Sequence, residues 1–207
     1  ATGEAAYDYA SFTIEDLLYL KASADNTSWA QSRIIMLESS GEGSIVVRTP
    51  GGETETMSAS VTSYTATENG TYTFTLKKDG KTVKKEVTVE RIDCTSPTVS
   101  FSSLPEGWQQ QFPNVTISGE DGSGAAASGI TSLKYKLVTE KGEYPTEGLL
   151  EAEVSGGKVD SQTISGEDAV NGLNYIYYIA QDAAGNTIQG YSSAIRVDGT
   201  VPTLAVE

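Results

Sequence analysis

The sequence predicts an all-β protein made of two tandem β-sandwich domains, and three observations carry this prediction. One phrase occurs twice, as Arg91–Thr98 and Arg196–Thr203, and each of its positions recurs 105 residues later (196 minus 91). A phrase repeated at the length of a small domain signals tandem modules. Threonine, valine, tyrosine and isoleucine also recur in short alternating runs broken by glycine, asparagine and aspartate, which is typical of strands. The 207 residues divide naturally into two domains of about 100 residues, each able to bury a core.

The repeated phrase is interpreted as the junction between modules. Pro97 and Pro202 lack an amide donor and suit the entrance or the edge of a strand, not the middle of a sheet. A strand-like run precedes each copy and another follows it. We therefore predict a linker at residues 1–13, a first domain at 14–93 and a second domain at 94–200, which meet near Asp93–Pro97. Residues 201–207 are expected to begin a following module or a linker.

The opening of the first domain allows two interpretations. In residues 13–22, Thr13 can cap a helix with Asp16 three residues on, and the apolar residues that follow have helical spacing. By analogy with the second domain, an opening strand belongs in this place. The pattern slightly favours a short helix over that strand.

The rest of the first domain is predicted to consist of strands. Arg33–Leu37 is a near-continuous apolar run, which is typical of a fully buried strand. Ile45–Arg48 and Ser60–Tyr64 are the next strands expected. Tyr72, Phe74 and Leu76 alternate with threonines and predict a half-buried strand, and Asp79-Gly80 turns it into a hairpin with residues 82–89.

The second domain repeats this plan with longer loops. Strands are expected at 98–101, around Val115 and Ile117, over 133–137, at 149–154 and at 159–164. The run Tyr175–Ala180 is a strand whose inward face depends on the register. An offset of 104 from the first domain places Ile176, Tyr178 and Ala180 inward, whereas 105 places Tyr177 and Ile179 there. We favour the offset of 104, because the turn at 183–186 then absorbs one extra residue.

Several of these segments together resemble the bacterial immunoglobulin-like repeats of large secreted and cell-surface proteins. The likeness rests on Ser128-Gly129-Ile130 at a strand start, on Ala180–Asn186 at the last hairpin, and on the closing Arg196–Thr203. A tryptophan before the second strand, Trp29 or Trp108, also fits. The first domain departs from the family pattern, since Lys78–Lys81 stands in place of the Asp-x-Ala-Gly-Asn hairpin. The resemblance implies immunoglobulin-like sandwiches that act as spacer or adhesive modules, with neighbouring modules of the same chain as partners.

Charge and residue content exclude several functions. The net charge of −14 comprises −5 from residues 1–93 (9 basic, 14 acidic) and −9 from residues 94–207 (5 basic, 14 acidic). This field repels nucleic acid and anionic lipid and favours cations. No apolar run approaches the ~18 residues that span a bilayer. The chain has no histidine, and its single cysteine, Cys94, is interpreted as a hinge residue, so we expect no enzyme.

Calcium is the sharpest candidate ligand. Asp93, Asp121, Asp182 and Asp198 lie in loops that a sandwich gathers near its ends, as does Glu120, and oxygen ligands in loops suit calcium. No segment matches a calcium loop of the Asp-x-Asp-x-Asp-Gly kind. Solvated acidic loops are therefore the preferred interpretation, and no cofactor is expected.

Two further features could bind ligands. The basic hairpin at residues 77–85 could meet an anionic glycan, but an edge hairpin protected from aggregation is preferred. Sugar stacking and ordinary packing explain the aromatic residues equally well; these are Tyr144, Tyr175, Tyr177, Trp29 and Trp108. We therefore expect non-catalytic spacer or adhesion modules of a bacterial secreted or cell-surface protein, with a host or cell-wall glycan or protein as a further partner. The alternative is a carbohydrate-binding module attached to a glycan-degrading enzyme.

Overall fold

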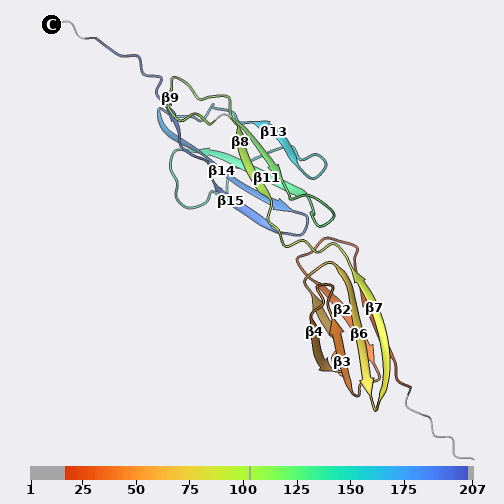
Figure 1. The fold of residues 1–207 in the computed structure, drawn as a ribbon. Coiled ribbons are helices and arrows are strands. Elements are labelled where there is room, and N and C mark those ends of the chain that lie inside the picture. The colour runs from red at the N-terminus through yellow and green to blue at the C-terminus, as the bar shows by residue number, and fades with distance from the viewer. Residues whose placement is uncertain (1–16, 103, 205–207) are drawn as a thin grey trace, which may run out of the picture. The chain divides into compact units, whose positions relative to one another are not determined.

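The computed structural model describes residues 17–102 and 104–204, and within these ranges it contains strands and no helix (Figure 1). The predicted all-β class is therefore confirmed. Internal contacts divide the chain into two compact units. The first comprises the residues up to Asp25, Ile34–Ala66 and Gly70–Val89, and the second comprises Asn26–Arg33, Thr67–Asn69 and the residues from Glu90 onward.

The strands up to Val89 form two antiparallel sheets. One has the order β1-β2-β5 and the other the order β4-β3-β6-β7. Figure 1 labels β2 of the first sheet and all four strands of the second. The strands are β1 (Leu20–Ala24), β2 (Arg33–Ser39), β3 (Ser44–Arg48), β4 (Thr54–Ser58), β5 (Ser63–Ala66), β6 (Gly70–Lys78) and β7 (Lys81–Val89).

The core of the first unit lies between these two sheets. Tyr72, Phe74 and Leu76 of β6 are buried, as their alternation with threonine predicts. Tyr64 of β5 meets Tyr72 and Phe74 with ring centroids 5.8 and 5.7 Å apart, so aromatic contacts join the two sheets. The β6–β7 hairpin turns at Asp79-Gly80, where both residues have positive φ, as a tight two-residue turn requires.

Three expectations for the first unit need correction. Residues 20–22 lie in β1, so the favoured helix is wrong there and the alternative strand is right, while residues 13–16 lie outside the described residues. The fully buried strand expected at Arg33–Leu37 is half-buried: Ile35 and Leu37 face the core, whereas Ile34 is 59% exposed. An apolar residue on an outer strand face costs little, so an unbroken apolar run does not prove burial on both faces. The strand expected at Ser60–Tyr64 begins only at Ser63.

The remaining strands form two sheets in the second unit. The order is β13-β10-β8 in one and β12-β11-β14-β16-β9 in the other, where β15 also pairs with β14. The strands are β8 (Thr98–Ser102), β9 (Trp108–Gln109), β10 (Thr116–Glu120), β11 (Ile130–Val138), β12 (Leu150–Glu151), β13 (Val159–Thr163), β14 (Gly172–Asp182), β15 (Thr187–Tyr191) and β16 (Ile195–Val197).

The long strand β14 settles the inward face that the sequence left ambiguous. Ile176 and Ala180 belong to the buried core and Tyr178 packs against it, so the offset of 104 is confirmed. Phe101 of β8 meets Tyr178 with ring centroids 5.6 Å apart, which links the two sheets of this unit. Three of the side chains that complete the core from the smaller sheet are Val115, Ile117 and Val159.

The strand-like run that begins at Thr203 is described only in part. Thr203 and Leu204 are not in a strand, and residues 205–207 lie outside the described residues. In the described part of the chain, no helix is both long and apolar enough to cross a membrane.

Candidate metal centre

Three buried aspartates converge in the second unit. Asp93, Asp121 and Asp182 each offer one carboxylate oxygen, and these atoms lie within 4.8 Å of one another. The three residues are only 3%, 6% and 2% exposed. Aspartate is rarely buried unless it is paired, hydrogen-bonded or bound to a metal, so this cluster requires a physical explanation.

Asp93 belongs to the repeated phrase. Its amide donates to the carbonyl of Ala30, which fixes the start of the turn. Its Oδ1 accepts the amide of Thr95 at 2.9 Å, and its Oδ2 accepts the amide of Ser128 at 2.8 Å. Both oxygens of Asp93 are therefore satisfied by backbone donors, which stabilise the ionised form.

Asp182 is the last residue of β14 and begins the hairpin that leads to β15. Its Oδ1 accepts the amide of Asn186 and its Oδ2 accepts the Asn186 side-chain amide, both at 2.8 Å. The same Asn186 Nδ2 donates to the carbonyl of Asp93 at 2.9 Å. Gly185 supplies the positive φ of +89° that lets the chain return toward Asp182. The Asp-x-Ala-Gly-Asn pattern therefore shapes one wall of the cluster.

Asp121 follows directly after β10 and differs from the other two aspartates. Its Oδ2 accepts the amide of Gly129 at 2.7 Å and the hydroxyl of Ser128 at 3.3 Å. Its Oδ1 is buried and has no hydrogen-bond partner. A buried carboxylate oxygen without a partner incurs a desolvation cost that nothing in its surroundings offsets.

The Ser128-Gly129 step connects the carboxylates of Asp93 and Asp121 to the hairpin that follows Asp182. Ser128 donates to Asp93 and Asp121 and accepts the amide of Ala184 on its hydroxyl. Gly129 has φ +83°, and a Cβ at this position would lie 3.2 Å from the Cα of Gly157. Only glycine fits this conformation and this close approach without strain.

The electrostatics separate Asp121 from Asp93. Burial alone would raise the pKa of Asp93, but hydrogen bonds from Thr95 and Ser128 outweigh it and the pKa lies below its ordinary value. Burial raises the pKa of Asp121. The hydrogen bond from Gly129 offsets this only in part, and the charges of Asp93 and Asp182 raise the pKa further. Asp121 is thus the carboxylate that most needs a positive charge nearby.

The donor set fits a hard divalent cation. It consists of carboxylate oxygens alone, which calcium prefers, whereas structural zinc sites use cysteine and histidine. Two ligands at about 2.3–2.6 Å from one calcium ion lie at most about 5 Å apart, so the observed spacing is compatible with a shared ion. In the part of the chain that the structure describes, no lysine or arginine forms an ion pair with any of the three. A depression of about 470 Å³, lined by Asp121, Ser128 and Gly129 among others, gives access from solvent.

Of the predicted calcium candidates, three come together and two do not. Asp198 is exposed and lies outside the cluster, as does Glu120. Sequence reasoning did not assign Ser128, Gly129 or Asn186 to the site, although it singled them out as carriers of the family resemblance. Their polar and glycine character at fixed spacing from the aspartates was the available signal.

The aromatic candidates pack in a different way. Tyr144, Tyr177 and Tyr191 lie with ring centroids 5.4–5.6 Å apart, and Tyr177 is 2% exposed. The amine of Lys141 lies 4.9 Å from the ring centroid of Tyr175. These ring contacts pack the loop after β11 against the outer face of the sheet. Trp108, on β9, is 60% exposed. The carbohydrate-binding alternative stays a prediction.

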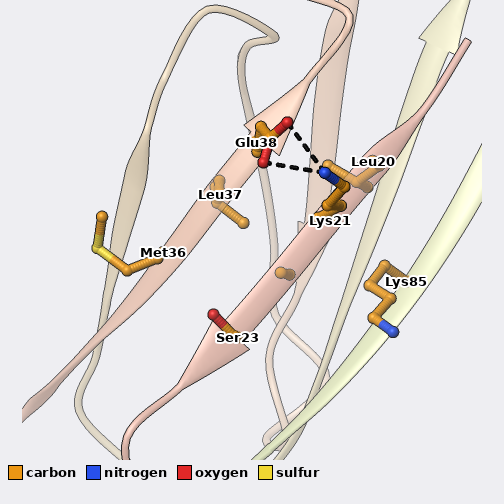
Figure 2. Close-up of a pocket in the computed structure, with 8 residues that line it drawn as sticks. Leu20, Lys21, Ser23, Met36, Leu37, Glu38 and Lys85 are labelled. Carbon is orange, nitrogen blue, oxygen red and sulfur yellow. Dashed lines mark hydrogen bonds and ion pairs between the residues drawn. The ribbon is translucent and has the colours of Figure 1, made fainter.

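A groove in the first unit offers weaker chemistry. Figure 2 shows the amine of Lys21 on β1 bound to both carboxylate oxygens of Glu38 on β2, with Lys85 of β7 across the groove. The Lys21 and Glu38 side chains are 69% and 60% exposed, so solvent screens this ion pair. We therefore regard the aspartate cluster as the better candidate site.

Comparisons with known proteins add little to this picture. No family model matches the chain, and no curated protein matches it. One similar solved structure is described as "Crystal structure of tetra-tandem repeat in extending region of large adhesion protein", with a TM-score of 0.35 and 17% sequence identity. The alignment covers 88% of this chain and 50% of that chain, so this chain spans about half the length of that one. At this TM-score the likeness carries no argument about function.

Proposed function

We propose that this chain is a pair of non-catalytic spacer or adhesion modules of a secreted or cell-surface protein, stabilised by a calcium ion bound in the aspartate cluster. The observation that carries the metal assignment is the buried, unpartnered Oδ1 of Asp121 beside two other carboxylates. A divalent cation there would neutralise part of the charge and satisfy the free oxygen in one step. Calcium concentrations outside cells are high enough to fill even a weak site.

The position of the cluster supports a structural role. The three aspartates are buried beneath the loops that they organise, so a macromolecular substrate could not reach them. Their carboxylates accept backbone amides of residues 95, 128, 129 and 186, which lie in segments far apart in the sequence. A bound ion would therefore hold several loops in one arrangement, as structural calcium sites do.

A proton could occupy the aspartate cluster in place of the calcium ion. The raised pKa of Asp121 means that its carboxyl group takes up a proton more readily than an ordinary aspartate. A protonated Asp121 could donate a hydrogen bond to a neighbouring carboxylate and so relieve the repulsion without metal. The two occupants differ in their response to added calcium at neutral pH.

Calcium titration of the intact chain by calorimetry, together with thermal unfolding, tests the proposal. We expect one calcium ion per chain, with a dissociation constant of about 10⁻³ M or tighter, and an unfolding temperature that rises with calcium concentration. Asp121→Asn should abolish both effects.

Asp198→Asn is the matched control. Asp198 accepts an amide in the same kind of turn as Asp93 but is exposed and outside the cluster. This variant should bind calcium as the wild-type chain does. If millimolar calcium left the unfolding temperature of the wild-type chain unchanged, the metal assignment would be wrong, and a proton would compensate the charge of the cluster.

A further inference from the structure

We propose that the surface around Asp198 is a docking face for a further module built like residues 98–200. In this contact Asp198 accepts the hydrogen bonds that Asp93 accepts within the second unit. This inference rests on the proposed role as tandem spacer modules. The partner is a β-sandwich that carries its own counterparts of Ser128, Gly129 and Asn186.

The turn at Asp198 repeats two hydrogen bonds of the turn at Asp93. The amide of Thr95 donates to Asp93 Oδ1 at 2.9 Å, and the amide of Thr200 donates to Asp198 Oδ1 at 3.0 Å. The amide of Asp93 donates to the carbonyl of Ala30, and that of Asp198 donates to the carbonyl of Gln109. Ala30 and Gln109 each follow a tryptophan, so the contacts match in the sequence as well as in space.

The support beneath each turn is also repeated. The guanidinium of Arg91 donates to the carbonyl of Thr27, and that of Arg196 donates to the carbonyl of Glu106. The residue before each aspartate forms a parallel bridge, Ile92 with Ala30 and Val197 with Gln109. These contacts stabilise the same conformation of the aspartate turn at both places.

The two aspartates differ in the partners of the carboxylate and the backbone carbonyl. Asp93 Oδ2 accepts the Ser128 amide, its carbonyl accepts Asn186 Nδ2, and the residue is 3% exposed. Asp198 is exposed, and within the described residues its carboxylate accepts hydrogen bonds from Thr200 alone, while nothing donates to its carbonyl. The same acceptors are thus presented twice, once occupied and once open.

The occupied copy identifies what fits the open one. The partner must donate a backbone amide to Oδ2 and a side-chain amide to the carbonyl, which Ser128 and Asn186 do for Asp93. A module with these two residues also brings counterparts of Asp121 and Asp182, so docking would rebuild the aspartate cluster with Asp198 as its third member. Exposed apolar side chains beside the face, Trp108 at 60% and Val201 at 79%, would add buried contact.

An extended chain tests this inference. Residues 1–202 are followed directly by a second copy of residues 98–200, which keeps the native spacing of five residues from aspartate to threonine (98 minus 93; 203 minus 198). Calorimetry should give two calcium ions per extended chain against one for the parent chain. Asp198→Asn in the extended chain should remove the second ion, and the same substitution in the parent chain should change nothing.

A second readout does not depend on calcium. With only the added copy labelled with ¹⁵N, the amide of its Ser128 counterpart should exchange slowly with solvent in chelator, and Asp198→Asn should speed this exchange. Asp79→Asn, at the tip of the exposed β6–β7 hairpin, is the control that should leave exchange unchanged. Fast exchange that is indifferent to Asp198 would overturn the docking proposal. Absence of calcium binding by the parent chain would instead overturn only the metal assignment.

Discussion

A single oxygen atom distinguishes the aspartate cluster from an ordinary hydrogen-bonded turn. Both oxygens of Asp93 and both of Asp182 accept hydrogen bonds, whereas Asp121 Oδ1 accepts none. The raised pKa of Asp121 and the lowered pKa of Asp93 follow from this difference in donors together with burial. The chemistry of the site therefore depends on how the charge of Asp121 is compensated.

Asp121→Asn should stabilise the calcium-free protein at pH 7, by about 1–3 kcal/mol, because it removes an uncompensated buried charge. The sign follows from the raised folded pKa: the proton-bound form favours folding, so stability is lost as pH rises from 3.8 through that pKa. Urea unfolding in chelator at pH 3 and pH 7 measures the effect. The gain should shrink at the lower pH, and a variant less stable than wild type at pH 7 would contradict it.

Gly129→Ala should destabilise the second unit by about 1–3 kcal/mol, because a non-glycine residue is strained at φ +83° and its Cβ meets Gly157. Loss of the correct Ser128-Gly129 geometry should also weaken calcium binding. Gly142→Ala is a suitable control, since a Cβ there meets nothing within 4 Å. Equal stability of the two variants, measured by urea unfolding, would show that the 128–129 step tolerates rearrangement.

At the level of single residues, the sequence was sufficient to identify the candidate aspartates but not to predict which of them lie close together. Asp93, Asp121 and Asp182 were chosen because they lie in loops, and the same reasoning also chose Asp198 and Glu120. The backbone amides of residues such as Ser128 and Gly129 determine which loops come together. Their positions cannot be predicted from composition. The preferred expectation of solvated acidic loops does not fit three residues that are nine-tenths buried.

At the level of elements, alternation with polar residues was the reliable signal. It placed Tyr72, Phe74 and Leu76 in the core, and the repeat offset of 104 then oriented β14. An unbroken apolar run was not reliable, because β2 leaves Ile34 on an exposed face. The outward-facing Tyr177 shows a second limit, since the loop after β11 buries it on the opposite side from the core.

The tyrosine cluster on β14 and β15 yields a prediction about this loop. Tyr144→Ala should lower the free energy of unfolding by about 1 kcal/mol through loss of its ring contacts with Tyr177 and Tyr191. It should also bring the pKa of Tyr177 back toward 10.0, because burial and the two neighbouring tyrosines raise it. Ultraviolet titration and urea unfolding measure the two effects.

Leu150→Ala removes another exposed side chain of the same sheet and should change stability by less than about 0.5 kcal/mol. A Tyr144 variant that behaves like this control would show that the loop does not depend on the ring stack.

At the level of the whole molecule, the proposed spacer role predicts that calcium acts on one unit only. Pulling the chain by its ends in a single-molecule experiment should give two unfolding steps, one for each compact unit. Calcium should raise the force of the second-unit step and leave the other unchanged, because all three aspartates belong to the second unit. Equal response of both steps would contradict a site confined to these residues.

The domain limits and the spacer role itself stay predictions, and so does the secreted or cell-surface location. The duplicated phrase predicted a repeat, and the same amide-to-carboxylate hydrogen bond is found in both aspartate turns.

The most direct measurement is a crystal structure of the chain grown with millimolar calcium at neutral pH. We expect one calcium ion about 2.3–2.6 Å from Asp121 Oδ1 and from an oxygen of both Asp93 and Asp182, with Asp198 unliganded. A well-ordered cluster in which Asp121 Oδ1 instead donates a proton to a neighbouring carboxylate, with no ion among the three, would contradict it.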